Sequence, residues 1–175
     1  RCVGIIGHGN MGSAFAEKLA GMGAVVLAHD RYVTGFGRDH VQESTLERIM
    51  AECDVVSLHL PLNEETRHYV DKAFLAGMKR PFWLLNTARG PLVDTAALID
   101  ALDEGRILGA GLDVLEMERD TLDGINDQDP VFRRLLTYDN VILTPHVAGV
   151  THEGKFRMAD ILATKMLKAI AHAPQ

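Results

Sequence analysis

Short apolar runs recur along this 175-residue chain, and most of them are continuously apolar instead of alternating with polar positions. A strand that is covered by helices on both faces has this pattern, whereas a strand with one solvated face alternates. We therefore predict a set of buried strands. They lie at residues 2–6, 24–28, 54–60, 82–85, 107–114 and 140–143.

Segments with helical spacing separate these runs. The C-terminal tail shows this spacing most clearly, because its apolar side chains recur every three or four positions, as on one face of a helix. Residues 116–129 are acidic and lack a clear period, so they are predicted to form a loop. The predicted helices lie at residues 11–22, from Ser44 or Thr45 to 53, at 71–76, at 95–104, and in the tail that carries Phe156, Ala159, Ala163, Met166 and Ile170.

The alternation of strands and helices favours an α/β fold, a doubly wound parallel sheet of the Rossmann type in three α/β/α layers. We expect residues 1–175 to form one such domain, an isolated cofactor domain. Sheets of this kind bind ligands outside the carboxyl ends of their strands, where the strand order reverses. Candidate chemistry is therefore expected in the residues that directly follow each strand.

Composition narrows the range of partners. Hydrophobic residues make up 47% of the chain and charged residues 24%, and the net charge is −6 without a long basic run. Nucleic acid and anionic membranes are therefore not expected as partners. No apolar stretch approaches the roughly 18 residues of a membrane span, and the N-terminus lacks the pattern of a signal peptide.

The cysteines and histidines give no sign of a metal site. Cys2 and Cys53 lack metal-ligand spacing, and the eight histidines include no H-x-x-x-H or Cys-paired cluster. Two reduced thiols in a cytoplasmic protein are expected, with a disulfide as the alternative. Because a strand pattern begins almost at Arg1, we also expect the chain to be a domain of a longer protein.

A glycine-rich turn follows the first predicted strand. Its G-x-G-x-x-G pattern needs a tight turn at Gly7, close approach of a pyrophosphate at Gly9, and close helix–strand packing at Gly12. The helix that follows offers free N–H groups and a partial positive charge to phosphates. An ordinary glycine turn is the alternative. The predicted phosphate-binding segment is Gly7-His8-Gly9-Asn10-Met11-Gly12.

An acidic residue follows the second predicted strand. Asp30 lies 18 residues after Gly12, and a carboxylate there can accept hydrogen bonds from both adenosine ribose hydroxyls. It would also repel a 2′-phosphate, which favours NAD over NADP. A solvent-exposed acid with no ligand is the alternative, and the neighbouring Arg31 leaves tolerance of NADP open.

The later strands also end in residues suited to ligand binding. Arg89, in the stretch "NTARG", has a forked guanidinium that can hold a carboxylate with two hydrogen bonds, although a surface arginine is the alternative. His146, in "TPH", is suited to acid–base work near neutral pH, although a lone histidine is often structural. Because every predicted strand ends in polar, glycine or proline signals, we expect one shared site at this edge.

The ordered set "GHGNMG", Asp30, "HLPL", "NTARG", "GLDVLEME" and "TPHVAG" resembles the nicotinamide-binding domain of the D-isomer-specific 2-hydroxyacid dehydrogenases. The resemblance runs from Val3 to about Ile170, and within the family it is strongest to phosphoglycerate dehydrogenases. It implies NAD as cofactor and a homodimer formed through cofactor domains. It also implies a second, substrate-binding domain, which this chain would lack, so that the isolated chain would be nearly inactive.

The resemblance assigns roles by position. Arg89 would bind the substrate carboxylate and carbonyl oxygen, His146 would exchange the proton, and Glu118 would pair with His146. Asp113 would hold the nicotinamide carboxamide. The residues expected to touch NAD are Gly7, His8, Gly9, Asn10, Met11, Gly12, Asp30, Arg31, Leu60, Pro61, Thr87, Ala88, Arg89, Asp113, His146, Ala148 and Gly149.

The implied activity is hydride transfer between NAD(H) and a 2-oxo or 2-hydroxy acid, with 3-phosphoglycerate as one candidate. Formate is disfavoured by a carboxylate at Glu118, and Arg119 departs from the proline common in the family. Two alternatives stay open. One is a non-catalytic NAD(H) sensor of the corepressor type, and the other is a methyltransferase, which needs no set such as Arg89, Glu118 and His146.

Overall fold

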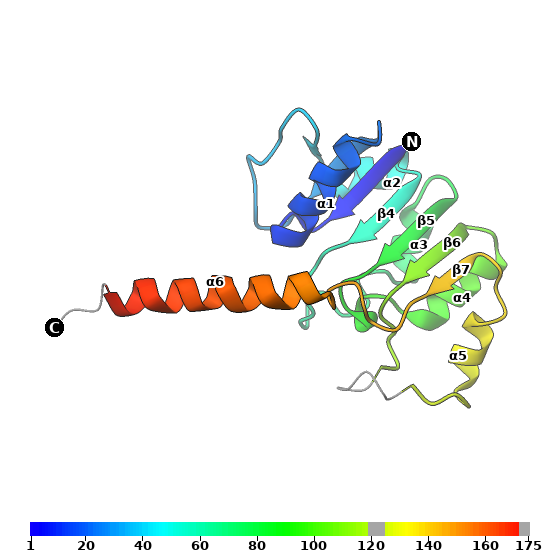
Figure 1. The fold of residues 1–175 in the computed structure, drawn as a ribbon. Coiled ribbons are helices and arrows are strands. Elements are labelled where there is room, and N and C mark those ends of the chain that lie inside the picture. The colour runs from blue at the N-terminus through cyan, green and yellow to red at the C-terminus, as the bar shows by residue number, and fades with distance from the viewer. Residues whose placement is uncertain (119–124, 172–175) are drawn as a thin grey trace. The chain divides into compact units, whose positions relative to one another are not determined.

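The computed structural model describes residues 1–118 and 125–171. Its sheet, within those residues, has seven strands in the order β3-β2-β1-β4-β5-β6-β7, and every adjacent pair is parallel. All carboxyl ends therefore lie at one edge, and the order reverses between β1 and β4 (Figure 1). The strands are β1 (Cys2–Ile6), β2 (Val25–His29), β3 (Gln42–Glu43), β4 (Val55–Leu58), β5 (Phe82–Asn86), β6 (Ile107–Leu112) and β7 (Val141–Leu143).

Most helices of the first 145 residues begin at a side chain that caps their free N–H groups. Thr45, Asp71, Asp94 and Asp129 each accept a hydrogen bond from a backbone N–H of the first turn. Helix α1 is different, since its N-cap is Gly9. The helices are α1 (Asn10–Ala20), α2 (Leu46–Glu52), α3 (Lys72–Gly77), the 3₁₀ helix η1 (Gly90–Leu92), α4 (Thr95–Asp103) and α5 (Pro130–Leu135).

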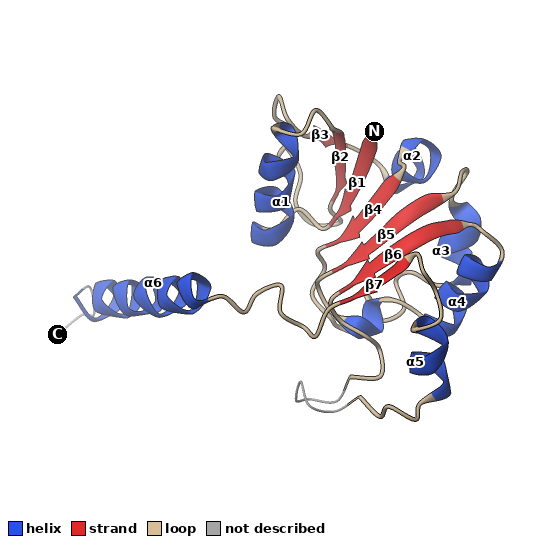
Figure 2. Ribbon diagram, turned by 45° about the vertical axis from the view of Figure 1, so that its right-hand side comes forward, coloured by secondary structure: helices blue, strands red, loops and turns tan. Residues whose placement is uncertain are grey.

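Two apolar clusters lie on opposite faces of the sheet, which confirms the three-layer α/β/α prediction. Helix α1 covers one face at β1 and β2, and α2, α3 and α4 cover the other (Figure 2). The smaller cluster joins Ala16 and Leu19 of α1 to Val3, Ile5, Val26 and Ala28. The larger cluster joins the helices of the other face to residues such as Ile6, Leu27, Val56, Leu58 and Leu84.

Within residues 1–145, one face of β5 and of β7 carries exposed apolar side chains. Trp83 lies between Phe82 and Leu84, which belong to the larger cluster, so its side chain points to the α1 face. It is partly exposed there, as is Ile142 on β7.

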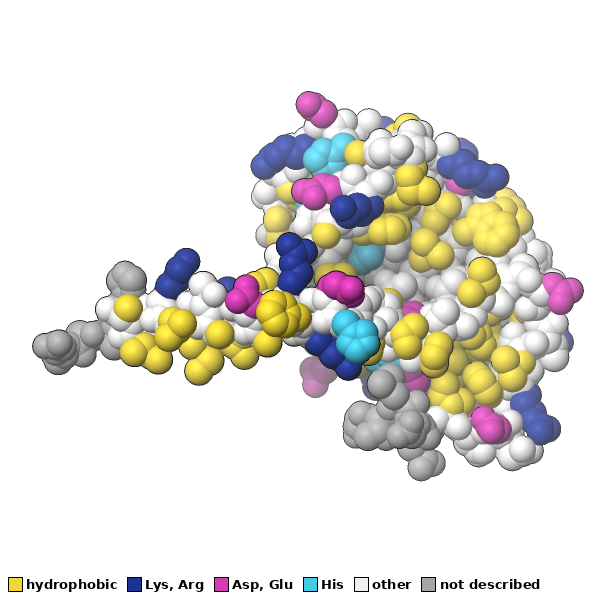
Figure 3. All heavy atoms as spheres, viewed as in Figure 1, with side chains coloured by type: hydrophobic (Ala, Val, Ile, Leu, Met, Phe, Trp, Pro, Cys, Tyr) yellow, Lys and Arg dark blue, Asp and Glu magenta, His cyan; other side chains and the backbone are white. Residues whose placement is uncertain are grey.

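Residues 1–145 and 146–175 are two compact units, and each is described by itself. The second unit contains helix α6 (His152–Ala171), which confirms the helix predicted in the tail. None of the α6 residues is buried, and hydrophobic side chains lie along it (Figure 3). Within the described parts of the chain, no helix has the length and apolarity that crossing a membrane requires.

Three elements of the first unit, β3, η1 and α5, were not predicted from the sequence. Strand β3 has only two residues, too few for a period-2 pattern. Helix α5 begins at Asp129-Pro130, a start signal at the end of the predicted loop 116–129, and no helix was predicted after that loop. Predicted strands 54–60 and 107–114 were also too long, because β4 and β6 end before the polar residues that follow them. Residues 119–124, including Arg119, lie outside the described part.

Candidate functional site

The turn after β1 places three glycines in three different environments. Gly7 has a φ of 93°, and a Cβ on it would lie 2.6 Å from the carbonyl oxygen of His59. A Cβ on Gly12 would overlap the carbonyl oxygen of Gly7. A Cβ on Gly9 would meet nothing within 4 Å. The fold therefore requires glycine at the first and third positions, whereas Gly9 leaves space beside the backbone.

The N-terminus of α1 opens directly behind this turn. Within the described residues, no side chain caps it and its first turn holds no acidic residue. Its free N–H groups and the helix dipole give this end a partial positive charge, which suits a phosphate.

Asp30 follows β2 and faces the same turn. Its Oδ2 accepts a hydrogen bond from the backbone N–H of His8 at 2.8 Å, and its Oδ1 accepts bonds from Tyr32 and Val33 N–H at 2.9 Å each. Burial alone would raise the pKa of Asp30, but these three backbone donors outweigh it and lower the pKa. The carboxylate is thus held ionised and oriented.

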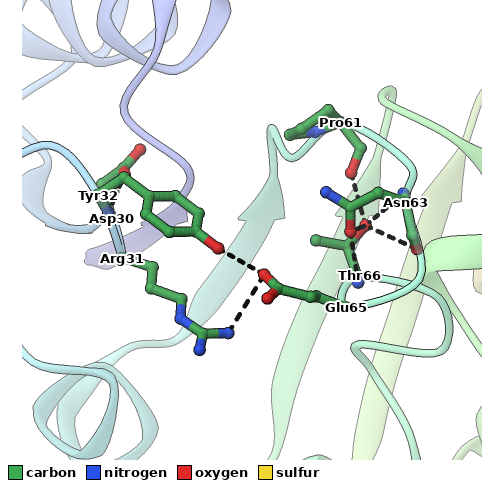
Figure 4. A network of polar contacts seen from close by, with 7 residues as sticks. All are labelled: Asp30, Arg31, Tyr32, Pro61, Asn63, Glu65 and Thr66. Carbon is green, nitrogen blue, oxygen red and sulfur yellow. Dashed lines mark hydrogen bonds and ion pairs between the residues drawn. The ribbon is translucent and has the colours of Figure 1, made fainter.

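A first cavity of about 290 Å³ lies at the carboxyl ends of β1, β2 and β4. Arg31 Nη1 and the Tyr32 hydroxyl both contact Glu65 Oε2, which joins the segments after β2 and β4 (Figure 4). The cavity is lined by Ile6, Gly7, Gly9, His29, Asp30, Arg31, Tyr32, His59, Leu60, Pro61, Asn63, Glu65, Thr66 and Tyr69.

A second cavity of about 200 Å³ lies at the ends of β4 to β7. Asp113 is 4% exposed, and its Oδ1 accepts a hydrogen bond from Thr144 Oγ1 at 2.5 Å. Its own N–H donates to the carbonyl of Asn86 at 3.0 Å. The cavity is lined by Phe15, Ser57, His59, Leu85, Thr87, Gly111, Leu112, Asp113, Ile142 and Thr144.

His59 lines both cavities, at the point where the strand order reverses. Burial lowers its pKa to about 4, so the imidazole is neutral at neutral pH. Its Nε2 lies 3.0 Å from Ser57 Oγ, and its ring packs against Phe15. His59 therefore forms an uncharged wall between the two cavities.

The turn after β5 is held in shape by a buried asparagine. Asn86 has no exposed surface, its Oδ1 accepts from Ala88 N–H at 3.1 Å, and its Nδ2 donates to the Arg89 carbonyl at 2.9 Å. Arg89 itself is exposed, and its guanidinium donates to the Ala88 carbonyl. Asn86 thus fixes the backbone of the turn that carries Arg89.

The turns after β5 and β6 touch each other. A Cβ on Gly90 would overlap the carbonyl oxygen of Leu115, so glycine is needed for this approach. Leu115 N–H in turn donates to Glu118 Oε1 at 2.6 Å. The fold therefore brings the segment that carries Arg89 beside the segment that carries Glu118.

The partly buried Glu116 holds the segment before Glu118 in place through its hydrogen bonds. Glu116 Oε2 accepts hydrogen bonds from the N–H and Oγ1 of Thr95 at 3.0 Å each, and Oε1 lies 2.5 Å from His68 Nε2. Burial would raise the pKa of Glu116, but the bonds from Thr95 and His68 lower it. Glu116 thus stays ionised and ties the turn to helix α4 and to the segment after β4.

His146, Ala148 and Gly149 belong to the second unit. His146 has a φ of 53°, in the left-handed region that few non-glycine residues adopt. Because this unit is described by itself, the expected pairing of His146 with Glu118 stays a prediction.

The sequence analysis overlooked several residues that shape this edge. Asn86 and Glu116 were inside the quoted motifs, but the structure was needed to show that Asn86 is buried and Glu116 partly buried. His59 was also inside a motif, but its position between two cavities depends on the strand order. Glu65 carried no signal, because its contact with Arg31 joins residues 34 positions apart.

Comparison with known proteins matches this architecture. A sequence model of the NAD binding domain of D-isomer specific 2-hydroxyacid dehydrogenases matches residues 1–148. The chain is 41% identical over 172 residues to a glyoxylate reductase of Korarchaeum cryptofilum, covering 95% of this chain and 48% of that protein. Its structure is similar to that of a D-2-hydroxyisocaproate dehydrogenase, with a TM-score of 0.88 and 29% identity over 100% of this chain and 54% of the other.

A solved D-lactate dehydrogenase with NAD⁺ from Lactobacillus jensenii is also similar, with a TM-score of 0.84 and 37% identity. That match covers 92% of this chain and 50% of the other. This chain thus spans about half the length of these relatives. The three proteins are named for three different acids, so the comparison identifies the family and leaves the substrate open.

Proposed function

We propose that this chain, which belongs to the D-isomer specific 2-hydroxyacid dehydrogenases as their NAD binding domain, supplies the cofactor half of an oxidoreductase that acts on a 2-hydroxy acid. The observation that carries the proposal is the shared edge of the sheet. There the turn from Gly7 to Gly12, the carboxylate of Asp30 and two adjacent cavities lie together.

NAD fits the residues at this edge. Gly9 leaves open space at the start of an uncapped helix, where a diphosphate would contact N–H groups. The ionised Asp30 lines the first cavity and would accept hydrogen bonds from ribose hydroxyls. The buried Asp113 lines the second cavity, where the resemblance expects the nicotinamide carboxamide.

Bound NAD would supply the hydride acceptor or donor, and the protein residues would position the acid. Arg89 is proposed to hold the substrate carboxylate with its forked guanidinium, oriented by the Asn86 bonds to its turn. His146 is proposed to move the proton at the C2 oxygen. Glu118 is proposed to favour the protonated imidazole, which keeps an acid available for ketone reduction.

We also propose that the protein is cytoplasmic and works as a homodimer through cofactor domains. The support for a cytoplasmic protein is its cysteine usage, since Cys2 and Cys53 are the only cysteines of the sequence and lack metal-ligand spacing. The partly exposed Trp83 and Ile142 supply apolar surface on one sheet face. Light scattering of the purified chain measures its mass directly, and a monomer at high concentration would contradict the dimer.

Two measurements test the main proposal. NADH added to this chain should give saturable fluorescence enhancement. A protein that joins this chain to a substrate-binding domain should oxidise NADH with glyoxylate, pyruvate, hydroxypyruvate or a branched 2-oxo acid. Saturable binding without turnover of any 2-oxo acid would instead support a sensor, and absence of binding would remove the proposal altogether.

A further inference from the structure

The residue beside Asp30 poses a problem of selectivity. In folds of this type an acidic residue after β2 binds the adenosine ribose, whereas a nearby arginine can accommodate the 2′-phosphate of NADP. This chain has both, as Asp30 and Arg31. Both line the first cavity, so an arginine is available where a 2′-phosphate would lie.

Arg31 is engaged by another side chain of the same cavity. Its Nη1 lies 3.4 Å from Glu65 Oε2, and the same oxygen accepts a hydrogen bond from the Tyr32 hydroxyl (Figure 4). The Arg31 guanidinium also lies 5.7 Å from the centre of the Tyr32 ring. One carboxylate therefore holds both residues that follow Asp30.

The segment that carries Glu65 is itself ordered by hydrogen bonds. Thr66 N–H donates to Asn63 Oδ1 at 3.0 Å, and Asn63 N–H donates to Thr66 Oγ1 at 2.9 Å. The Thr66 hydroxyl also donates to the Pro61 carbonyl at 2.6 Å. Glu65 thus projects from a closed turn after β4, directly beside two residues that line the cavity.

We propose that Glu65 is a cofactor-selectivity residue, which excludes a 2′-phosphate by neutralising Arg31 and by adding a second carboxylate beside Asp30. This inference rests on the proposed function, because it assumes that adenosine occupies the first cavity. Under this proposal the chain can carry Arg31 and still disfavour NADP. The hydroxyls of NAD have no charge, so Glu65 does not oppose them.

The expected effect of Glu65 on NADPH affinity is limited by the solvent exposure of the Arg31–Glu65 pair. The Arg31 and Glu65 side chains are 69% and 51% exposed, so water and salt screen their interaction. A 2′-phosphate carries up to two negative charges, which increases its repulsion by a nearby carboxylate. We expect removal of the Glu65 charge to strengthen NADPH binding about tenfold at low ionic strength.

The test compares NADH and NADPH titrations of the full 175-residue chain. Glu65→Gln should bind NADPH about tenfold more tightly than the unmodified chain, with NADH affinity changed less than about twofold. Glu64→Gln is the matched control, because it removes the same charge from an exposed neighbour that does not line the cavity. It should leave both affinities unchanged.

A second substitution tests whether Arg31 is the side chain that binds the 2′-phosphate. In the Glu65→Gln background, Arg31→Gln should abolish the gain in NADPH affinity. If Glu65→Gln and Glu64→Gln bind NADPH equally, Glu65 has no selectivity role, even though NADH binding still supports the proposed function. If the unmodified chain binds neither dinucleotide, the proposed function fails and this inference fails with it.

Discussion

The two ends of the proposed site differ in how they are built. At the Asp30 end, one unit supplies everything: the glycine turn, the start of α1 and a carboxylate fixed by three backbone N–H groups. At the other end, Arg89 and Glu118 lie on adjoining turns of that unit, and His146 lies in the second unit.

This difference shows which side chains of the proposed site are positioned by the sheet itself. Backbone geometry and packing suffice to orient the Asp30 carboxylate, because parallel strands bring their carboxyl ends to one edge. The proposed proton transfer would need His146, which belongs to the second unit. We therefore expect cofactor binding and catalysis to separate cleanly under mutation.

The largest expected effect is on turnover, at the residue proposed to move the proton. In a protein with a substrate-binding domain, His146→Gln should lower the rate of 2-oxo acid reduction by about 10²–10⁴-fold, because the proton donor is lost. NADH affinity should change less than about twofold. His152→Gln removes an exposed histidine of the same unit and is the control. Equal rates for the two variants would contradict the role of His146.

The next largest effect is on stability, at the glycine turn. Gly12→Ala should lower the free energy of unfolding by about 3 kcal/mol, because the new Cβ overlaps the Gly7 carbonyl oxygen. Gly9→Ala meets nothing within 4 Å, so it should cost less than about 1 kcal/mol. It should nevertheless weaken NADH binding about tenfold or more, because its Cβ enters the space proposed for the diphosphate.

Urea unfolding and NADH titration of both variants provide the measurements. If the predictions hold, Gly12 is needed for folding and Gly9 is needed for binding of the ligand. A Gly9→Ala chain that is stable and binds NADH normally would show that no diphosphate approaches this position.

His59, which lines both cavities, gives the free energy of unfolding a pH dependence. The pKa of His59 falls from 6.5 in the unfolded chain to about 4 in the folded one, so the unfolded state binds more protons between these values. His59 therefore contributes stability above pH 6.5 that is lost as the pH falls towards 4. The loss should reach about 3 kcal/mol.

Unfolding free energies of His59→Gln and of the unmodified chain, measured from pH 7 to pH 4, test this prediction. The variant should show a shallower decline, because glutamine does not titrate. His152→Gln, which replaces an exposed histidine, should follow the unmodified curve. Parallel curves for His59→Gln and the unmodified chain would mean that His59 is readily protonated in the folded state.

Prediction from sequence succeeded for features that depend only on residues close together in the chain. The fold class followed from alternating apolar runs and helical periods, and Gly7, Gly12 and Asp30 lie where the motif spacing placed them. Thr45 and Asp71 cap their helices, as short-range capping chemistry predicts.

Prediction failed where the signal depends on segments that are distant in sequence. The contact between Glu65 and Arg31, the bond between Glu116 and His68, and the position of His59 between two cavities all follow from the strand order. Strand β3 was missed for a different reason, because two residues cannot display a period. Local patterns thus reveal the binding motifs but not the contacts that tune them.

The smallest predicted effect concerns how the two site aspartates are held. Asp30 is held by backbone donors, which only a proline substitution would remove, whereas Asp113 accepts a bond from the Thr144 hydroxyl. Thr144→Val should therefore lower the free energy of unfolding by about 1 kcal/mol. It should also weaken NADH binding roughly fivefold, because the Asp113 carboxylate is less well oriented for the carboxamide.

ADP-ribose lacks the nicotinamide ring and provides the internal comparison for Thr144→Val. Its affinity should not change, because it would occupy only the Asp30 end of the site. Thr137→Val removes an exposed hydroxyl outside both cavities and is the control for NADH binding. If Thr144→Val weakens ADP-ribose and NADH equally, the substitution acts through the whole sheet edge, and Asp113 does not distinguish the nicotinamide end from the adenosine end.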